Sequence, residues 1–124
     1  KHRPSVGYPI YFSQDGTDPG VSSVIQEFVR KEHDVFHFRF SYVKDKEVKM
    51  IKNLQAYYRI SQHYKWAFGK VFDELEYDKA IVLEDDMELS PDFFSYFAAA
   101  GDLLDQGKHI CFYQVQLFST RVSL

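Results

Sequence analysis

Acidic side chains follow two apolar runs of this sequence and are the first candidates for chemistry. Glu84, Asp85 and Asp86 come directly after the apolar run at 80–83, and Asp15 comes shortly after a β-prone run. Adjacent carboxylates repel one another, so a cation or hydrogen-bond donors must compensate them. Oxygen ligands without a cysteine or a histidine pair suit a hard ion such as Mg²⁺ or Mn²⁺, which often bridges to phosphates. The triplet is compatible with a metal-diphosphate site, but for three acidic residues alone a solvated loop that helps to cap a helix is the favoured interpretation, so the metal site needs support from the rest of the sequence.

The first half of the chain predicts a strand, a helix and a second strand. The run Tyr8–Ser13 predicts a strand that ends in a tight turn at residues 14–16. Thr17 or Asp18 then caps a helix that extends to about residue 32. Its apolar stripe consists of Val21, Val24, Ile25, Phe28 and Val29. Alternating phenylalanines over residues 36–40 predict the second strand, and residues 41–52 have the composition of a surface loop.

The second half predicts a long helix, a central strand and a further helix. The long helix begins near Asn53, and its inward face is expected to hold Leu54, Tyr57, Tyr58, Ser61, Tyr64, Phe68, Val71, Phe72 and Leu75. Residues Lys79–Leu83 are apolar on both faces, as in a central parallel strand. Ser90 and Pro91 are expected to open the last helix and Gly107 to end it, with Phe93, Phe94, Phe97 and Leu104 inward. A β-prone run follows at 109–118.

Strands that alternate with helices predict an α/β fold, an open and mostly parallel sheet with helices on both faces. Ligands of such sheets bind beyond the carboxyl ends of the strands. Asp15 and the 84–86 triplet both follow predicted strands. We therefore expect the two acidic turns to share one rim of the sheet.

Composition excludes several classes of function. With 15 basic against 18 acidic residues and a net charge of -3, the chain is not expected to bind nucleic acid. Its one cysteine allows neither an internal disulfide nor a thiolate zinc site. Apolar runs are far shorter than the roughly 20 residues of a membrane span, and no signal peptide is expected in this stretch. Because it opens at Lys1, we expect the chain to be part of a longer protein.

Three motifs of the sequence, in order, resemble those of the N-acetylglucosaminyltransferase I family, Golgi enzymes that start complex N-glycans. They are Ser13–Gly16 (SQDG), Leu54–Ala67 (LQAYYRISQHYKWA) and Ile81–Phe94 (IVLEDDMELSPDFF). The resemblance covers about Tyr8 to Gln106. It implies that residues 1–106 are part of a nucleotide-sugar domain with the glycosyltransferase A-type, Rossmann-like fold, and that residues 107–124 diverge from the family.

The resemblance also implies an activity and a set of roles. The family uses UDP-N-acetylglucosamine and Mn²⁺, inverts the anomeric centre and builds a β-1,2 link to the α-1,3-linked mannose of a high-mannose N-glycan. By carry-over, Asp86 is the metal ligand, Asp85 and Glu84 hold ribose and sugar hydroxyls, and Asp15 and His63 contact the uridine. The metal neutralises the leaving diphosphate, while a separate carboxylate must take the proton of the acceptor hydroxyl. That general base is expected downstream of this chain, so no catalytic residue is assigned within it.

His63 has an alternative interpretation as an ordinary surface histidine, because it lies off the predicted inward stripe of its helix. However, Arg59, His63 and Trp66 share a second helical face at spacings of four and three. A tryptophan outside the core stripe needs another partner. We therefore favour an edge that faces the nucleotide.

Other functions stay open on the sequence alone. The chain could be an inactive fragment that only binds Mn²⁺ and a UDP-sugar, or an unrelated α/β domain with a phosphoacceptor-like acidic pocket. A sister transferase acting on O-linked mannose is the nearest enzymatic alternative. For the family function, the expected location is the lumenal face of the Golgi membrane, with the membrane anchor upstream of this segment.

Overall fold

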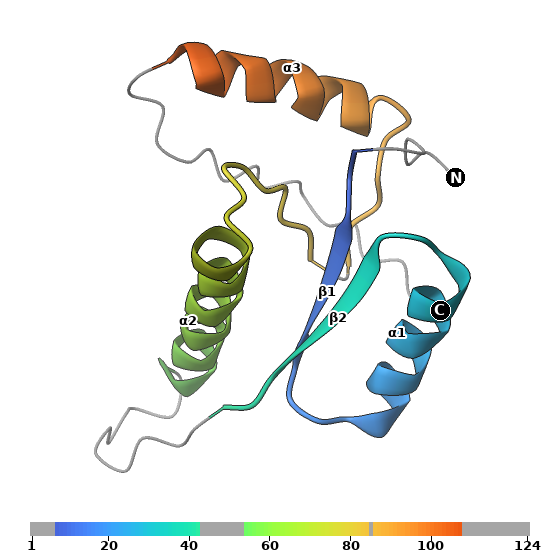
Figure 1. The fold of residues 1–124 in the computed structure, drawn as a ribbon. Helices are drawn as coiled ribbons and strands as arrows, with labels where there is room; N and C mark the ends of the chain where they lie inside the picture. Colours follow the sequence, from blue (N-terminus) through green and yellow to red (C-terminus); the bar gives the residue numbers. More distant parts are fainter. Residues whose placement is uncertain (1–6, 43–53, 85, 108–124) are drawn as a thin grey trace. The chain divides into compact units, whose positions relative to one another are not determined.

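A computed structural model describes residues 7–42, 54–84 and 86–107 of the chain. The described residues form two compact units that divide after Asp78. In chain order the elements are β1 (Ile10–Asp15), α1 (Pro19–Lys31), β2 (Val35–Phe40), α2 (Gln55–Phe68), η2 (Gly69–Glu74) and α3 (Phe93–Gln106) (Figure 1). Most of the loop predicted at 41–52 and the whole run at 109–118 lie outside the described residues.

The first unit is built on a parallel pair of strands. β1 and β2 run in register from Ile10 beside Val35 to Asp15 beside Phe40. The ladder continues one step further, since the Gly16 amide donates to the Phe40 carbonyl at 2.9 Å. For this reason β1 ends at Asp15, two residues later than predicted. Gly16 then turns the chain with a φ of 82°, a conformation that glycine adopts without strain.

Helix α1 connects the two strands and covers one face of the pair. It begins as predicted, with Asp18 as its cap: the Asp18 carboxylate accepts the Val21 amide at 2.9 Å. Ile25 is buried, and the Phe28 ring lies 6.0 Å from that of Phe12 on β1. The predicted stripe is covered only in part, because Val21, Val24 and Phe28 remain exposed in the described structure.

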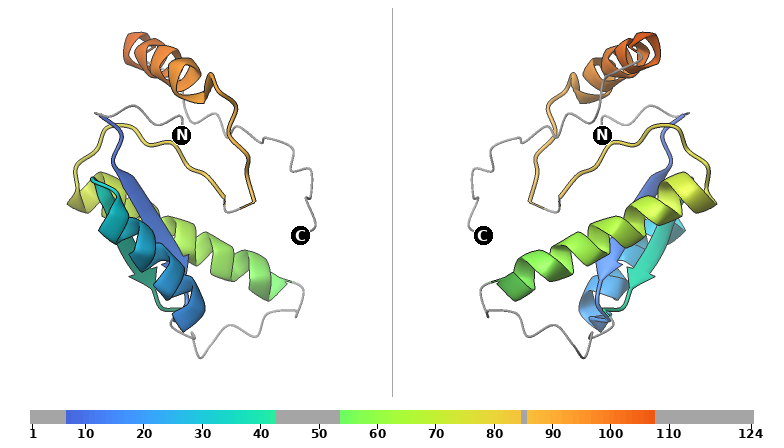
Figure 2. Two further views of the ribbon diagram at one scale, coloured as in Figure 1. Left: turned by 90° about the vertical axis from the view of Figure 1, so that its right-hand side faces the viewer. Right: turned by 90° about the vertical axis from the view of Figure 1, so that its left-hand side faces the viewer.

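Helix α2 covers the opposite face, so the two strands lie between two helices (Figures 1 and 2). The Trp66 ring packs 6.4 Å from Phe38 and 5.3 Å from Phe40, both on β2. Near the start of β1, Tyr11 stacks on Phe36 and shares a 2.8 Å hydrogen bond with Tyr77. This arrangement confirms the α/β class in a small form, a two-stranded parallel sheet with helices.

The face of α2 that packs on the sheet is not the predicted one. Leu54 and Tyr57, expected to point inward, are exposed, whereas His63 and Trp66 contact the strands. The alternating phenylalanines of β2 offer ring surfaces, and tryptophan buries more area against them than smaller apolar side chains can. Part of the predicted stripe forms a separate row along the helix, in which Phe68 lies 5.6 Å from Tyr64 and 5.9 Å from Phe72.

The long helix extends as far as predicted but changes its winding near the end. From Gly69 to Glu74 it is a π-helix, closed by the Leu75 amide that donates to the Lys70 carbonyl at 3.0 Å. The element therefore runs continuously from Gln55 to Glu74. Wider turns of this kind often occur near functional sites.

In the second unit, the predicted central strand at Lys79–Leu83 is wrong. This run forms no strand with any other described residue, and Val82 and Leu83 are 47% and 44% exposed. A strand needs hydrogen-bonded neighbours, and an apolar sequence alone does not supply them. Lys79 instead forms an ion pair with Asp105 of α3 at 2.6 Å.

The start of α3 also differs from the prediction. Ser90 does not cap the helix: its hydroxyl donates to the Asp92 carboxylate at 2.6 Å, and the helix begins at Phe93. Phe93 is buried at 5% exposure and packs against Phe97 with ring centroids 4.8 Å apart. Leu104 was predicted to point inward but is exposed. The helix ends before Gly107, as predicted.

Candidate functional site

His63 lies on the sheet face that α2 covers, close to the carboxyl ends of both strands. Its Nε2 atom shares a 2.7 Å hydrogen bond with the Ser13 hydroxyl of β1. Its ring stacks on Phe40 of β2, with centroids 5.4 Å apart and planes 12° from parallel. His63 is half-buried, so the interpretation as an ordinary surface histidine is wrong.

Asp15 comes to the same end of the same face. Side chains alternate along a strand, so Asp15 lies on the side of Ser13, which binds His63. Its register partner is Phe40, the residue on which His63 stacks. Asp15 is exposed, while Ser13 and Phe40 are half-buried. The fold thus brings the two predicted uridine contacts to one edge, with the carboxylate at its open end.

Sequence reasoning missed Ser13 as a member of this edge. The signal was present, because a residue two positions before Asp15 must lie on the same face of the strand. Its partner on α2 could not be read from the sequence without knowing how that helix lies on the sheet.

One helical turn before His63, Arg59 adds a positive charge to this end of the unit. Its guanidinium carbon lies 5.2 Å from the centre of the Tyr42 ring, just beyond β2. Tyr42 in turn meets Tyr58 edge to ring at 6.4 Å. A cation over an aromatic face is held in place by the charge distribution of the ring. Aromatic rings, a histidine, an arginine and a carboxylate are therefore distributed around the carboxyl ends of β1 and β2.

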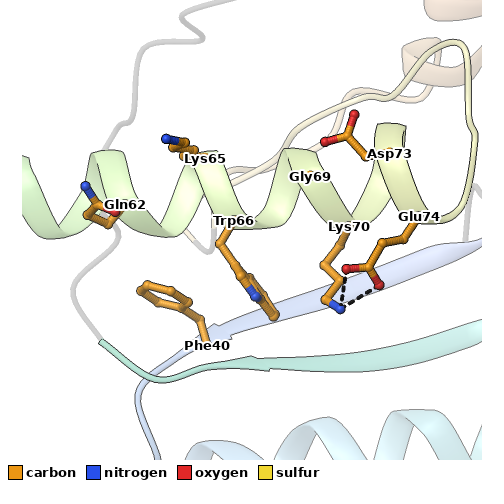
Figure 3. Close-up of a pocket in the computed structure, with 8 residues that line it drawn as sticks. All are labelled: Phe40, Gln62, Lys65, Trp66, Gly69, Lys70, Asp73 and Glu74. Atoms are coloured by element: carbon orange, nitrogen blue, oxygen red, sulfur yellow. Dashed lines mark hydrogen bonds and ion pairs between the residues drawn. The ribbon is translucent and has the colours of Figure 1, made fainter. Parts of the chain in front are cut away.

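A groove of about 390 Å³ lies further along α2, and the sequence did not indicate it. Figure 3 shows Phe40, Trp66, Lys70 and Glu74 extending from β2, α2 and η2 toward one another, while Lys65 and Asp73 point away from the strands. The Lys70 ammonium is 2.6 Å from the Glu74 carboxylate and 5.9 Å from the centre of the Trp66 ring. The Lys70 charge is thus paired with that of Glu74 within the groove, which favours a packing role for these two side chains.

The acidic turn lies in the second unit. The Met87 amide donates to the Glu84 carbonyl at 3.4 Å, and the Glu84 amide points at the Met87 sulfur at 3.4 Å. Glu84 and Asp86 are exposed, and Asp85 lies outside the described residues. Because the structure does not fix how the two units lie relative to each other, a rim shared by this turn and Asp15 stays a prediction.

The carboxylates of this turn limit what kind of metal could bind. Across residues 7–42, 54–84 and 86–107, no three His, Cys, Asp or Glu side chains gather closely enough to hold an ion. Asp86 can offer its exposed carboxylate. That donor set fits a hard divalent ion that keeps several waters and takes its remaining ligands from a diphosphate.

Comparisons with known proteins agree with this arrangement of motifs. The sequence profile described as the GNT-I family matches residues 1–115. The chain belongs to the GNT-I family. It is also 41% identical over 103 residues to the Arabidopsis thaliana protein named alpha-1,3-mannosyl-glycoprotein 2-beta-N-acetylglucosaminyltransferase. The aligned part is 83% of this chain and 22% of that relative, so the chain spans about a fifth of its length.

Membership of the GNT-I family confirms the resemblance seen in the three motifs. All three motifs lie within the matched residues 1–115. No helix in the described part of this family member is long and apolar enough to cross a membrane.

Proposed function

We propose that this chain is the donor-binding part of an N-acetylglucosaminyltransferase that uses UDP-N-acetylglucosamine. Its acceptor is the α-1,3-linked mannose of an N-glycan, to which the enzyme adds a β-1,2 link with inversion, at the lumenal face of the Golgi membrane. Support for the activity comes from the similarity to the Arabidopsis transferase. In this proposal the two units belong to a glycosyltransferase A-type domain.

One structural observation carries the assignment of this part to the donor. Asp15 and His63 come from separate motifs, yet both lie at the carboxyl ends of β1 and β2 on one face. In open parallel sheets, nucleotides bind at this end of the strands. Asp15 can accept hydrogen bonds from the uracil or ribose, and the His63 ring offers a nitrogen and a flat surface.

The proposal also gives roles to the residues of the acidic turn. Asp86 holds Mn²⁺, and Glu84 and Asp85 hold the hydroxyls of the ribose and the sugar. When bound, the ion neutralises the diphosphate as it leaves. The acceptor proton needs another carboxylate as its base, and we expect that base in the remainder of the protein.

Thermal unfolding with UDP-N-acetylglucosamine, with and without Mn²⁺, tests this proposal. Ligand at a hundred times its dissociation constant adds about 2.7 kcal/mol, so the melting temperature should rise by roughly ten degrees. The rise should need Mn²⁺ and should disappear in Asp86→Ala. Asp102→Ala is the matched control, because it removes another exposed carboxylate, from α3.

The outcomes test the metal role of Asp86 separately from donor binding by the chain. An equal rise in Asp86→Ala and the wild type would contradict the metal role of Asp86. No rise in a cooperatively folded wild type would contradict donor binding by this chain.

A further inference from the structure

Gln14 is the only polar residue in the described part of the chain that is buried, with 4% of its surface exposed. It lies on the α1 side of the sheet. Its Oε1 atom is 2.9 Å from His37 Nε2 and 2.9 Å from the Ser22 hydroxyl, and its Nε2 atom donates to the Asp18 carbonyl at 3.1 Å. A buried amide that loses its partners costs free energy, so these bonds select one orientation of the side chain.

The same contacts fix the ring of His37. The Gln14 oxygen can only accept, so His37 Nε2 carries the proton that is donated to it. On the other side of the ring, the Gln26 amide nitrogen lies 3.0 Å from Nδ1 and donates to it. Both ring nitrogens of a neutral His37 are thereby used. One network joins β1, α1 and β2.

This network lies beside the end of β1 that carries Asp15. Gln14 precedes Asp15 directly, and successive strand side chains point to opposite faces. An orientation of Gln14 fixed toward α1 therefore directs Asp15 to the face where His63 lies. On the other side of Asp15, the Gly16 amide is held by the Phe40 carbonyl. Contacts at the start of α1 hold the other end of the turn: the Asp18 carboxylate accepts the Val21 amide, and the Asp18 carbonyl lies 2.9 Å from the Ser22 hydroxyl.

We propose that Gln14 and His37 are positioning residues for Asp15, and that they set the affinity of the chain for the nucleoside diphosphate of the donor. Neither touches the ligand. Their network holds the end of β1 and the turn after it, residues 14–18, in the shape that binds the ligand. The inference rests on the proposed function for the identity of the ligand, but the order of the turn can be measured without any ligand.

The first experiment measures hydrogen exchange of the Gly16 amide by NMR. Gln14→Met keeps the length of the side chain and removes its amide, so Gly16 should exchange about tenfold faster than in the wild type. Gln26→Met is the matched control, because Gln26 is exposed and contacts only the outer nitrogen of His37. Its Gly16 exchange should stay close to the wild-type rate. Should Gln14→Met fail to fold, Ser22→Ala removes one bond of the network more gently.

The second experiment measures UDP affinity by calorimetry in the presence of Mn²⁺, using variants that circular dichroism shows to be folded. His37→Leu should bind UDP about tenfold more weakly. His37→Gln restores a donor to Gln14 and should recover most of that loss, which a simple loss of packing would not do.

Gly16 exchange and UDP affinity together distinguish a failure of the proposed function from a failure of the positioning role. If the wild type binds no UDP, the proposed function fails, and Gly16 exchange still decides whether the network orders the turn. If the wild type binds UDP and His37→Leu binds it equally well, the positioning role is overturned. Unchanged Gly16 exchange in both Gln14→Met and Ser22→Ala overturns it as well.

Discussion

His63 and Ser13 share a 2.7 Å hydrogen bond that joins α2 to β1 two residues before that strand ends. It is a tertiary contact between two motifs of the GNT-I family, one on a strand and one on a helix. Because Ser13 and Asp15 lie on the same face of β1, this hydrogen bond also holds His63 near Asp15. Loss of this bond should therefore change ligand binding as well as stability.

His63→Phe tests that relation, because phenylalanine can keep the stack on Phe40 but cannot bond to Ser13. We expect the free energy of unfolding to fall by about 1 kcal/mol and UDP affinity to fall about tenfold. Denaturant unfolding and calorimetry measure the two effects. Phe40→Leu is the complementary variant, since it removes the stack and keeps the hydrogen bond. Wild-type UDP affinity in His63→Phe would show that the ring nitrogen has no part in binding.

The local pattern of the sequence predicted most elements of the first unit. Asp18 as cap, the parallel order of two strands and the extent of the long helix follow from short-range rules that hold within one element. The inward face of α2 did not follow, because Trp66 competes with the predicted stripe for the aromatic surface of β2. The face of α2 that packs on the sheet therefore depends on the side chains that β2 presents to it.

The strand predicted at residues 79–83 failed for a related reason. Its apolar composition indicates burial on two faces but does not show which strand would pair with it. A strand exists only when another strand forms hydrogen bonds with it. In the candidate site, the residue types and their strand-end positions were predictable. The bond from His63 to Ser13 and the buried Gln14 were not, because each depends on how a helix packs against the sheet.

Stability should depend on pH through His37. Burial, and to a lesser degree the positive charge of Arg39, hold the pKa of His37 below its ordinary value of 6.5. The unfolded chain therefore binds more protons than the folded chain once the pH falls below about 6.5. The contribution of His37 is complete above that pH and is lost as the pH falls toward the folded pKa.

Urea unfolding of the wild type and His37→Gln between about pH 8 and about pH 5 measures this contribution. Other titrating groups are common to both proteins, so the difference between the two curves isolates His37. We expect the wild type to lose more stability than the variant on acidification. Parallel curves would contradict a half-buried His37 that is neutral in the folded chain.

Tyr11 should titrate at unusually high pH. Burial, followed by its hydrogen bond to Tyr77, raises the pKa of Tyr11 from 10.0 to about 12. Because the folded pKa is the higher one, this contribution to stability is complete below pH 10 and is lost as the pH rises toward about 12. Ultraviolet titration should show a phenol with a midpoint near 12 that is absent in Tyr11→Phe. An unchanged titration curve in the variant would assign that midpoint to another tyrosine.

An NMR titration of the isotope-labelled chain with UDP in the presence of Mg²⁺, a diamagnetic hard ion that prefers the same oxygen ligands as Mn²⁺, tests the central claim most directly, because it reports where the nucleotide binds. We expect saturable shifts of the Asp15 and Gly16 amides and of the His63 ring, with small changes at Lys70 and Glu74 in the groove of Figure 3. In Asp15→Asn the shifts should need much more UDP to saturate, while the spectrum of the free protein stays nearly unchanged. Saturable shifts confined to the groove, or no shifts at Asp15 and His63, would contradict a donor site at the ends of β1 and β2.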